Sequence, residues 1–118
     1  AARRVYSMPP AHGALLAGRV LSDPVLRASW ESELSAICAR MIDLRTQLSE
    51  KLSEKTNQDF SFISKEKGMF SFLGLSVDQA RGLRKDRGLY MLDSSRINVA
   101  ALNQQNMDKV VDAVASVL

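Results

Sequence analysis

The sequence predicts an α/β domain in which helices pack on an open sheet, preceded by one long helix. Two observations carry this expectation. Residues 24–55 have apolar side chains at steps of three and four, which is the helical period, and no glycine or proline follows Pro24 in this stretch. From residue 59 onward, short aromatic and β-branched runs alternate with helical patterns in the order β-β-α-β-β-α.

The amino-terminal part is expected to be helical. Proline and glycine within 9–13 mark a turn, and a short helical pattern then continues to about residue 21. Ser22 or Asp23 can cap the long helix, and Pro24 suits its first turn. About 30 residues span roughly 45 Å at the helical rise, so either a coiled coil or a helix that bridges two domains is expected. The apolar stripe consists of Leu26, Trp30, Leu34, Ile37, Met41, Leu44, Leu48 and Leu52.

The carboxyl-terminal part carries the pattern of the sheet. Residues 60–64 and 69–73 have strand-like sequences and are expected to form a hairpin or adjacent strands. A helix is expected over 77–87, because Ser76 can cap its start and Gly88 can end it. The remaining expected elements are short strands over 89–92 and 96–99 and a last helix that begins at Asn103.

Composition and charge argue against several classes of partner. The chain has 16 basic and 13 acidic residues, interspersed, for a net charge of +3, which is too weak to predict binding to nucleic acid or to an anionic membrane. No apolar run approaches the roughly 20 residues of a membrane helix. Cys38 is the only cysteine, so we expect an inert, packed thiol in a reducing compartment. His12 is the only histidine, so we predict a structural role and no metal site.

Arg96 is the strongest candidate for a functional side chain. Two serines precede it and the strand-like Ile97-Asn98-Val99 follows it, so we expect it at the edge of the sheet. Arginine is the preferred partner of a carboxylate, because its planar fork donates two parallel charge-assisted hydrogen bonds. The residues alone leave two explanations open. Arg96 either makes a structural ion pair, which is the commoner case, or binds an anion from outside the protein.

Three stretches together resemble a known family. They are YSMPPAHGA at 6–14, GMFSFLGL at 68–75 and SSRINVAAL at 94–102. In this order and spacing they resemble the carboxyl-terminal part of the class I aminotransferases, in particular the aspartate and aromatic aminotransferases, over essentially the whole chain. The resemblance implies the small domain of the fold-type I pyridoxal-phosphate-dependent transferases. Residues 1–36 would be the end of the large domain and the first half of a bridging helix, and 37–118 the small domain.

The resemblance also assigns binding roles. Arg96 corresponds to the arginine that binds the substrate's α-carboxylate, and Phe70 to an aromatic residue that lines the same site. Arg3, or the adjacent Arg4, corresponds to an arginine that reaches into the neighbouring subunit's site, where it binds the distal carboxylate, and we assign Arg3. Ser7 approaches that site too. The next position is commonly Asn in the family and is Met8 here, which bears on one polar contact near the neighbour's site. The shared site implies a homodimer.

Pyridoxal 5'-phosphate is the cofactor that the resemblance implies. The family's Schiff-base lysine lies upstream of the first of the three stretches, and no lysine of this chain has a matching context. We therefore assign no catalytic residue to this chain and expect it to be inactive alone. The chain also starts without an initiator methionine, and we interpret it as part of a longer protein.

The function implied by the resemblance is that of an aspartate aminotransferase, which exchanges the amino group between L-aspartate and 2-oxoglutarate. Its partners would be dicarboxylic amino and keto acids, without nucleic acid or membrane. The near alternative is an aromatic amino-acid aminotransferase. An alternative of another class is a non-catalytic α/β module whose long helix serves association. We expect a cytoplasmic protein, with the mitochondrial matrix as the alternative.

Overall fold

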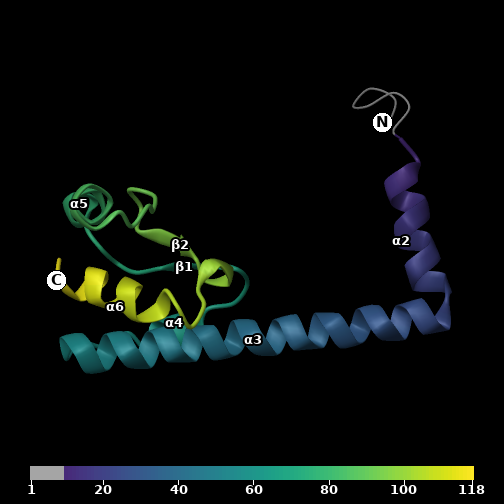
Figure 1. Cartoon of the computed structure of the whole chain (residues 1–118), viewed down its shortest axis with the longest axis horizontal. Helices are drawn as coiled ribbons and strands as arrows, with labels where there is room; N and C mark the ends of the chain where they lie inside the picture. Colours follow the sequence, from purple (N-terminus) through teal and green to yellow (C-terminus); the bar gives the residue numbers. More distant parts are fainter. Residues whose placement is uncertain (1–9) are drawn as a thin grey trace. The chain divides into compact units, whose positions relative to one another are not determined.

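The computed structural model of the chain describes residues 10–118 (Figure 1). The backbone divides into two compact units, Ala1–Cys38 and Ala39–Leu118. The first unit contains the helix α2 (His12–Ser22) and the beginning of the helix α3 (Pro24–Thr56). All strands of the described residues belong to the second unit. The assignment of 1–36 to a large domain and of 37–118 to a small domain stays a prediction.

The two amino-terminal helices lie where the sequence predicts them, and the structure selects the cap between them. The Asp23 carboxylate accepts hydrogen bonds from the backbone N–H groups of Val25, at 3.0 Å, and Leu26, at 3.3 Å. Ser22 turns back instead, and its hydroxyl donates to the carbonyl oxygen of Arg19. Asp23 is therefore the residue that begins α3, as its short acidic side chain favours.

The apolar stripe of α3 has two different environments. Leu44, Leu48 and Leu52 are buried against the second unit's core, and Met41 packs against the same core. The earlier members of the stripe, in the first unit, are 41–56% exposed within this chain: Leu26, Trp30, Leu34 and Ile37. The stripe is therefore one continuous helical pattern of which only the second part packs within Ala39–Leu118.

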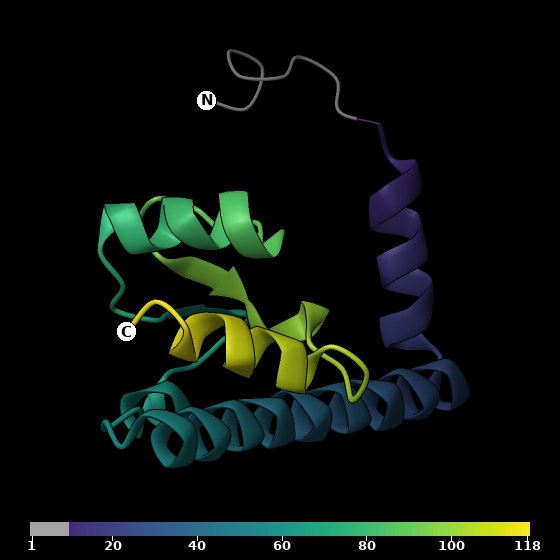
Figure 2. The same ribbon diagram turned by 60° about the vertical axis from the view of Figure 1, so that its left-hand side comes forward.

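The second unit is built from short elements around the end of α3. Two antiparallel strands, β1 (Phe70–Phe72) and β2 (Arg96–Asn98), form its sheet. Both Figures 1 and 2 show α6 running alongside the carboxyl-terminal part of α3, with α5 on the side of the unit away from α3. The helical elements are α4 (Phe62–Lys65), α5 (Val77–Arg87), the 3-10 helix η1 (Val99–Ala101) and α6 (Met107–Ala115).

The core of this unit joins α3, α5, α6 and the connecting segments. Its side chains are aliphatic for the most part, and several of them are fully excluded from solvent. Ion pairs on the surface add contacts between α3 and α6, since Lys51 meets Asp108 at 2.7 Å and Lys55 meets Asp112 at 3.0 Å. The completely buried large apolar residues are Leu48, Leu52, Ile63, Leu83, Val99 and Val114.

The expected strand over 60–64 is wrong, because this segment turns into the short helix α4. Phe60 and Ile63 are both buried, three residues apart, which is a helical and not an extended spacing. The Asp59 carboxylate accepts a hydrogen bond from the backbone N–H of Ser61 at 2.8 Å, which favours the turn. Aromatic and β-branched composition alone did not reveal this local competition.

The expected strand over 89–92 is also wrong. Burial alternates along it, with Met91 buried between the exposed Tyr90 and Leu92, so the backbone is extended. In the described part of the chain, however, no neighbouring strand pairs with it. The predicted open sheet is thus reduced to two strands here. The last helix also begins later than expected, because the Asn103 side chain accepts hydrogen bonds from the backbone of Gln105 and Asn106 in a turn before α6.

Helix α5 is confirmed as predicted, and its end offers a clean test of backbone conformation. Gly88 has φ +64°, and a Cβ added there would meet no atom within 4 Å, so Gly88→Ala should cost only the left-handed penalty of about 1–2 kcal/mol. Gly82 lies inside the same helix with the same free space. Gly82→Ala should therefore stabilise by up to about 1 kcal/mol. Urea unfolding measures the free energy of unfolding of both variants. A change of the same sign in the two variants would contradict the prediction.

Candidate functional site

The two-stranded sheet places the predicted functional residues on one exposed face. Phe70 is opposite Asn98, and Phe72 is opposite Arg96, and these four side chains are exposed. Side chains alternate across a strand, so the middle pair, Ser71 and Ile97, faces the other way. The small Ser71 is completely buried while both phenylalanines are about half-exposed. The apolar rings of β1 are therefore not core residues of this unit.

Arg96 and Phe70 are brought together across the strands. The Arg96 guanidinium carbon lies 4.6 Å from the centre of the Phe70 ring, which is a cation–π contact. Among residues 10–118, no carboxylate lies within 4.0 Å of the Arg96 nitrogens. The described residues thus give Arg96 no structural ion pair. Its guanidinium carbon lies over a ring, and its donors are available to an external anion.

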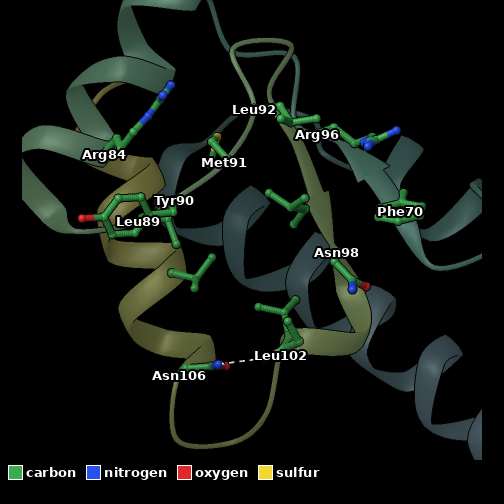
Figure 3. Close-up of a pocket in the computed structure, with 13 residues that line it drawn as sticks. Phe70, Arg84, Leu89, Tyr90, Met91, Leu92, Arg96, Asn98, Leu102 and Asn106 are labelled. Atoms are coloured by element: carbon green, nitrogen blue, oxygen red, sulfur yellow. Dashed lines mark hydrogen bonds between the residues drawn. The ribbon is translucent and has the colours of Figure 1, made fainter.

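A pocket of about 540 Å³ lies beside this pair (Figure 3). It runs between the extended segment 89–92, β2 with η1, and the start of α6. In Figure 3, the Arg96 side chain extends toward Phe70 and away from Leu89 and Tyr90, so the cation stands at one end of the pocket. Most of the lining is apolar, and the residues with polar side-chain groups are Arg84, Tyr90, Arg96, Asn98 and Asn106.

The turn before Arg96 is strongly constrained. Ser95 is buried and has φ +60°, an uncommon conformation for a residue other than glycine. Its hydroxyl accepts a hydrogen bond from the Gly74 N–H at 3.1 Å, and its carbonyl accepts from the Leu73 N–H at 3.1 Å. These bonds attach the turn to the end of β1. They fix the direction in which the chain enters β2, and hence the position of Arg96.

Asp93 connects the same turn to α5. Its carboxylate accepts hydrogen bonds from Arg84 and from Arg81, the latter at 2.8 Å. The Arg84 hydrogen bond, followed by that of Arg81, holds the pKa of Asp93 below its usual value. The pair of arginines keeps this carboxylate ionised and oriented, and the carboxylate in turn binds both cations.

A lowered pKa gives a pH dependence with a definite sign. Because the folded-state pKa of Asp93 is lowered, its contribution to stability is present above the unfolded carboxyl pKa and is lost as pH falls through the folded value. Carbon NMR of the Asp93 carboxyl group should therefore show titration below that of an unfolded peptide. Arg84→Met and Arg81→Met should each raise this pKa. If the Asp93 carboxyl group of the native protein titrated with the pKa of an unfolded peptide, its hydrogen bonds to the two arginines would be contradicted.

The other predicted residues have varied outcomes. Arg3 and Ser7 lie outside the described residues. His12 is the first residue of α2, at the helix start where the sequence places it, and its structural role stays a prediction. Cys38 is exposed in this chain, so the expectation of a packed thiol is wrong for the described residues. Within residues 10–118, no three His, Cys, Asp or Glu side chains come together as metal ligands, and no helix is long and apolar enough to cross a membrane.

Two arginines of α3 were missed in the sequence analysis. Arg40 donates to the carbonyl oxygens of Ala100 and Leu102, at 3.3 and 3.1 Å, and so holds η1 just after β2. Arg45 is 4% exposed and lies under β1. One signal could have found Arg45. It stands on the apolar stripe, one residue after Leu44, where a charge must be satisfied internally.

Comparison with known proteins places the whole chain in one family. The family model described as aminotransferase class I and II matches residues 1–114. The chain belongs to the class I and II aminotransferase family. This confirms the resemblance that the three stretches predicted.

Individual members of the aminotransferase family align along the full chain. An aspartate aminotransferase of Salmonella typhi is 45% identical in an alignment of 119 positions, which covers 100% of this chain and 30% of that protein. An aromatic-amino-acid aminotransferase of Paracoccus denitrificans is 40% identical over 116 residues, which are 98% of this chain and 29% of that protein. The chain therefore spans about 30% of the length of the curated relatives it matches.

A solved aminotransferase structure has the same fold. The aromatic-amino-acid aminotransferase of Burkholderia pseudomallei, covalently bound to pyridoxal phosphate, superposes with a TM-score of 0.93 at 44% identity. The superposition covers 98% of this chain and 29% of that one. The predicted fold of the pyridoxal-phosphate-dependent transferases is thereby confirmed, with the sheet of the described residues corrected to two strands.

The described residues do not by themselves fit the cofactor. No lysine lines the pocket beside Arg96. Lys51 and Lys55, on α3, are engaged by Asp108 and Asp112 at the surface. A lysine that bonds to pyridoxal phosphate would need a pocket with room for the ring, and this chain offers none of its lysines there. The residues of this pocket therefore supply no chemical step through the cofactor.

Proposed function

We propose that this chain supplies the substrate α-carboxylate site of a pyridoxal-phosphate-dependent aminotransferase. The observation that supports this proposal is the environment of the Arg96 guanidinium. It is exposed, its carbon lies 4.6 Å from the centre of the Phe70 ring, and it has no carboxylate partner among the described residues. The cofactor, bound elsewhere in the full-length protein, would supply the electron sink for amino-group transfer. The residues of this chain would bind and orient the amino or keto acid.

The preferred substrates are L-aspartate and 2-oxoglutarate. A planar fork held on an aromatic ring suits one carboxylate of a dicarboxylic acid, with two parallel charge-assisted bonds. The second carboxylate would meet Arg3 from the neighbouring subunit, with Ser7 close by. This arrangement needs a homodimer. Binding both ends of the substrate fixes its orientation at the reacting carbon, which is a large part of what such an enzyme contributes.

An aromatic amino-acid aminotransferase is the second candidate. Two observations support it. Relatives with that name align over almost the whole chain, and the pocket beside Arg96 has a mostly apolar lining. The non-catalytic association module is the weaker alternative, because the exposed stripe in α3 supports association but leaves the placement of Arg96 on Phe70 unexplained. A single cysteine is compatible with the cytoplasm or the mitochondrial matrix, and we propose the cytoplasm.

One experiment separates these functions. The full-length gene product, reconstituted with pyridoxal phosphate, is assayed with 2-oxoglutarate and a series of donors: aspartate, glutamate, tyrosine, phenylalanine and alanine. The aspartate proposal expects the highest kcat/KM for aspartate. A higher value for tyrosine or phenylalanine would establish the second candidate, and no transfer from any donor would leave the association module.

A further inference from the structure

Arg45 is a buried cation whose hydrogen bonds converge on one short segment. The residue is 4% exposed, on α3 beneath the loop that leads into β1. One terminal nitrogen donates to the carbonyl oxygens of Gly68, at 2.8 Å, and Phe70, at 2.6 Å. The other donates to the carbonyl oxygen of Ile63 at 3.1 Å and to the Ser71 hydroxyl at 3.2 Å.

The charge of Arg45 is only loosely balanced. Glu66 is the one carboxylate among the described residues within 4.0 Å of it, at 3.4 Å, and is itself 30% exposed. The Ser71 hydroxyl donates to the same Glu66 carboxylate, so Arg45, Ser71 and Glu66 form a closed network. Taking a cation out of water is costly, and here backbone carbonyls satisfy most of it. This explains why β1 buries its serine and exposes its phenylalanines.

The hydrogen bonds of Arg45 are connected to the candidate anion site through the backbone of β1. The Phe70 carbonyl that Arg45 holds belongs to the residue whose ring lies under Arg96. The Met69 carbonyl next to it accepts from the Val99 N–H at 2.8 Å, at the end of β2. The position of β1 relative to α3 thus determines where the Phe70 ring stands, and the ring supports the guanidinium of Arg96.

We propose that Arg45 is a positioning residue for the carboxylate site, acting through Phe70 on Arg96. This inference rests on the proposed function of Arg96. Arg45 does not touch the substrate. It fixes the position of the Phe70 ring. The ring in turn supports the Arg96 guanidinium where two of its N–H groups can donate to one carboxylate. A lysine at position 45 keeps the charge but has no planar fork, so it cannot hold the same set of acceptors.

The test compares Arg45→Lys with Arg96→Lys and with the double variant, in the full-length protein loaded with pyridoxal phosphate. The probe is succinate, a dicarboxylate without an amino group, and its Kd is measured by calorimetry. We expect Arg45→Lys to raise the Kd about tenfold, the order expected from a misplaced binding group. In the Arg96→Lys background, Arg45→Lys should add less than about twofold, the scatter of independent sites.

Ser49→Ala is the matched control. Ser49 is also buried on α3, and its hydroxyl donates to the Phe60 carbonyl at 2.9 Å, away from β1. This variant should lower the thermal midpoint and leave the succinate Kd unchanged. A merely structural role of Arg45 would lower the midpoint but give a Kd like that of Ser49→Ala, or a factor that multiplies in full with that of Arg96→Lys. Either result would overturn the inference.

The Arg96→Lys and Arg45→Lys results also distinguish failure of the proposed function from failure of the role of Arg45. If Arg96→Lys weakens succinate binding and Arg45→Lys does not, the proposed function stands and the role of Arg45 is wrong. If Arg96→Lys leaves the Kd unchanged, the proposed function fails, and the inference fails with it.

Discussion

Arg96→Met in the full-length, cofactor-loaded protein should reduce kcat/KM for aspartate roughly 100- to 1000-fold, or about 3–4 kcal/mol. The reason is that the substrate carboxylate would enter the site without its bidentate partner and would be left unpaired. The Phe70 ring would remain, but a thioether cannot form the cation–π contact that now holds Arg96 at 4.6 Å. The kcat/KM of Arg96→Lys should lie between those of Arg96→Met and the parent protein, since lysine keeps the charge but has no planar guanidinium.

The control for this prediction is Arg87→Met. Arg87 is exposed in the last turn of α5 and has no ion-pair partner among the described residues, so this variant removes the same charge at a distance from the pocket. It should leave kcat/KM unchanged. A value for Arg96→Met within about threefold of the parent protein would mean that no carboxylate binds here, because a lost buried charge pair costs far more than that.

The helices were predictable because their signals are local. Asp23 and Ser76 cap α3 and α5 through bonds to backbone groups two or three residues away, and Gly88 ends α5 in the left-handed conformation that only glycine adopts readily. Such signals need no knowledge of the rest of the fold. The limits of α2, α3 and α5 therefore agree closely with the sequence pattern.

The strands were less predictable because a strand needs a partner. Residues 89–92 are extended and alternate in burial, yet no other segment of the described chain pairs with them. Residues 60–64 have strand-like composition, but the Asp59 side chain and the burial of Phe60 and Ile63 favour a helical turn. Composition measures how well a residue fits a sheet, and the competing turn depended on a single aspartate.

Some residues of the candidate site were predictable from the sequence and others were not. Arg96 and Phe70 were identified from short sequence stretches, and the structure brings them together. The absence of a carboxylate near Arg96 in residues 10–118 was not predictable, because an ion pair can come from any part of the chain. Arg45 was missed for the same reason. Three of its five acceptors are carbonyl oxygens, of residues 63, 68 and 70, and every sequence has a carbonyl at each position.

The largest effect on stability should come from Leu48→Ala, at about 2–5 kcal/mol. Leu48 is completely buried in the core shared by α3, α4, α5 and α6, one helical turn after Leu44. Removing three carbons there loses apolar burial and leaves a cavity between rigid helices. Hydrogen exchange of the backbone amides of β1 and β2 in the full-length protein is the measurement, because it reports opening of this unit alone.

Glu50→Ala is the matched control, since Glu50 lies two residues later on the exposed side of the same helix and alanine favours helices. It should change the opening free energy of β1 and β2 by less than about 0.5 kcal/mol. Leu48→Met should cost less than about 1.5 kcal/mol, because the volume is nearly kept. If Leu48→Ala accelerated exchange in α3 but not in β1 and β2, the strands would have their own support, and the core beneath the Arg96–Phe70 pair would not be the structure that holds it in place.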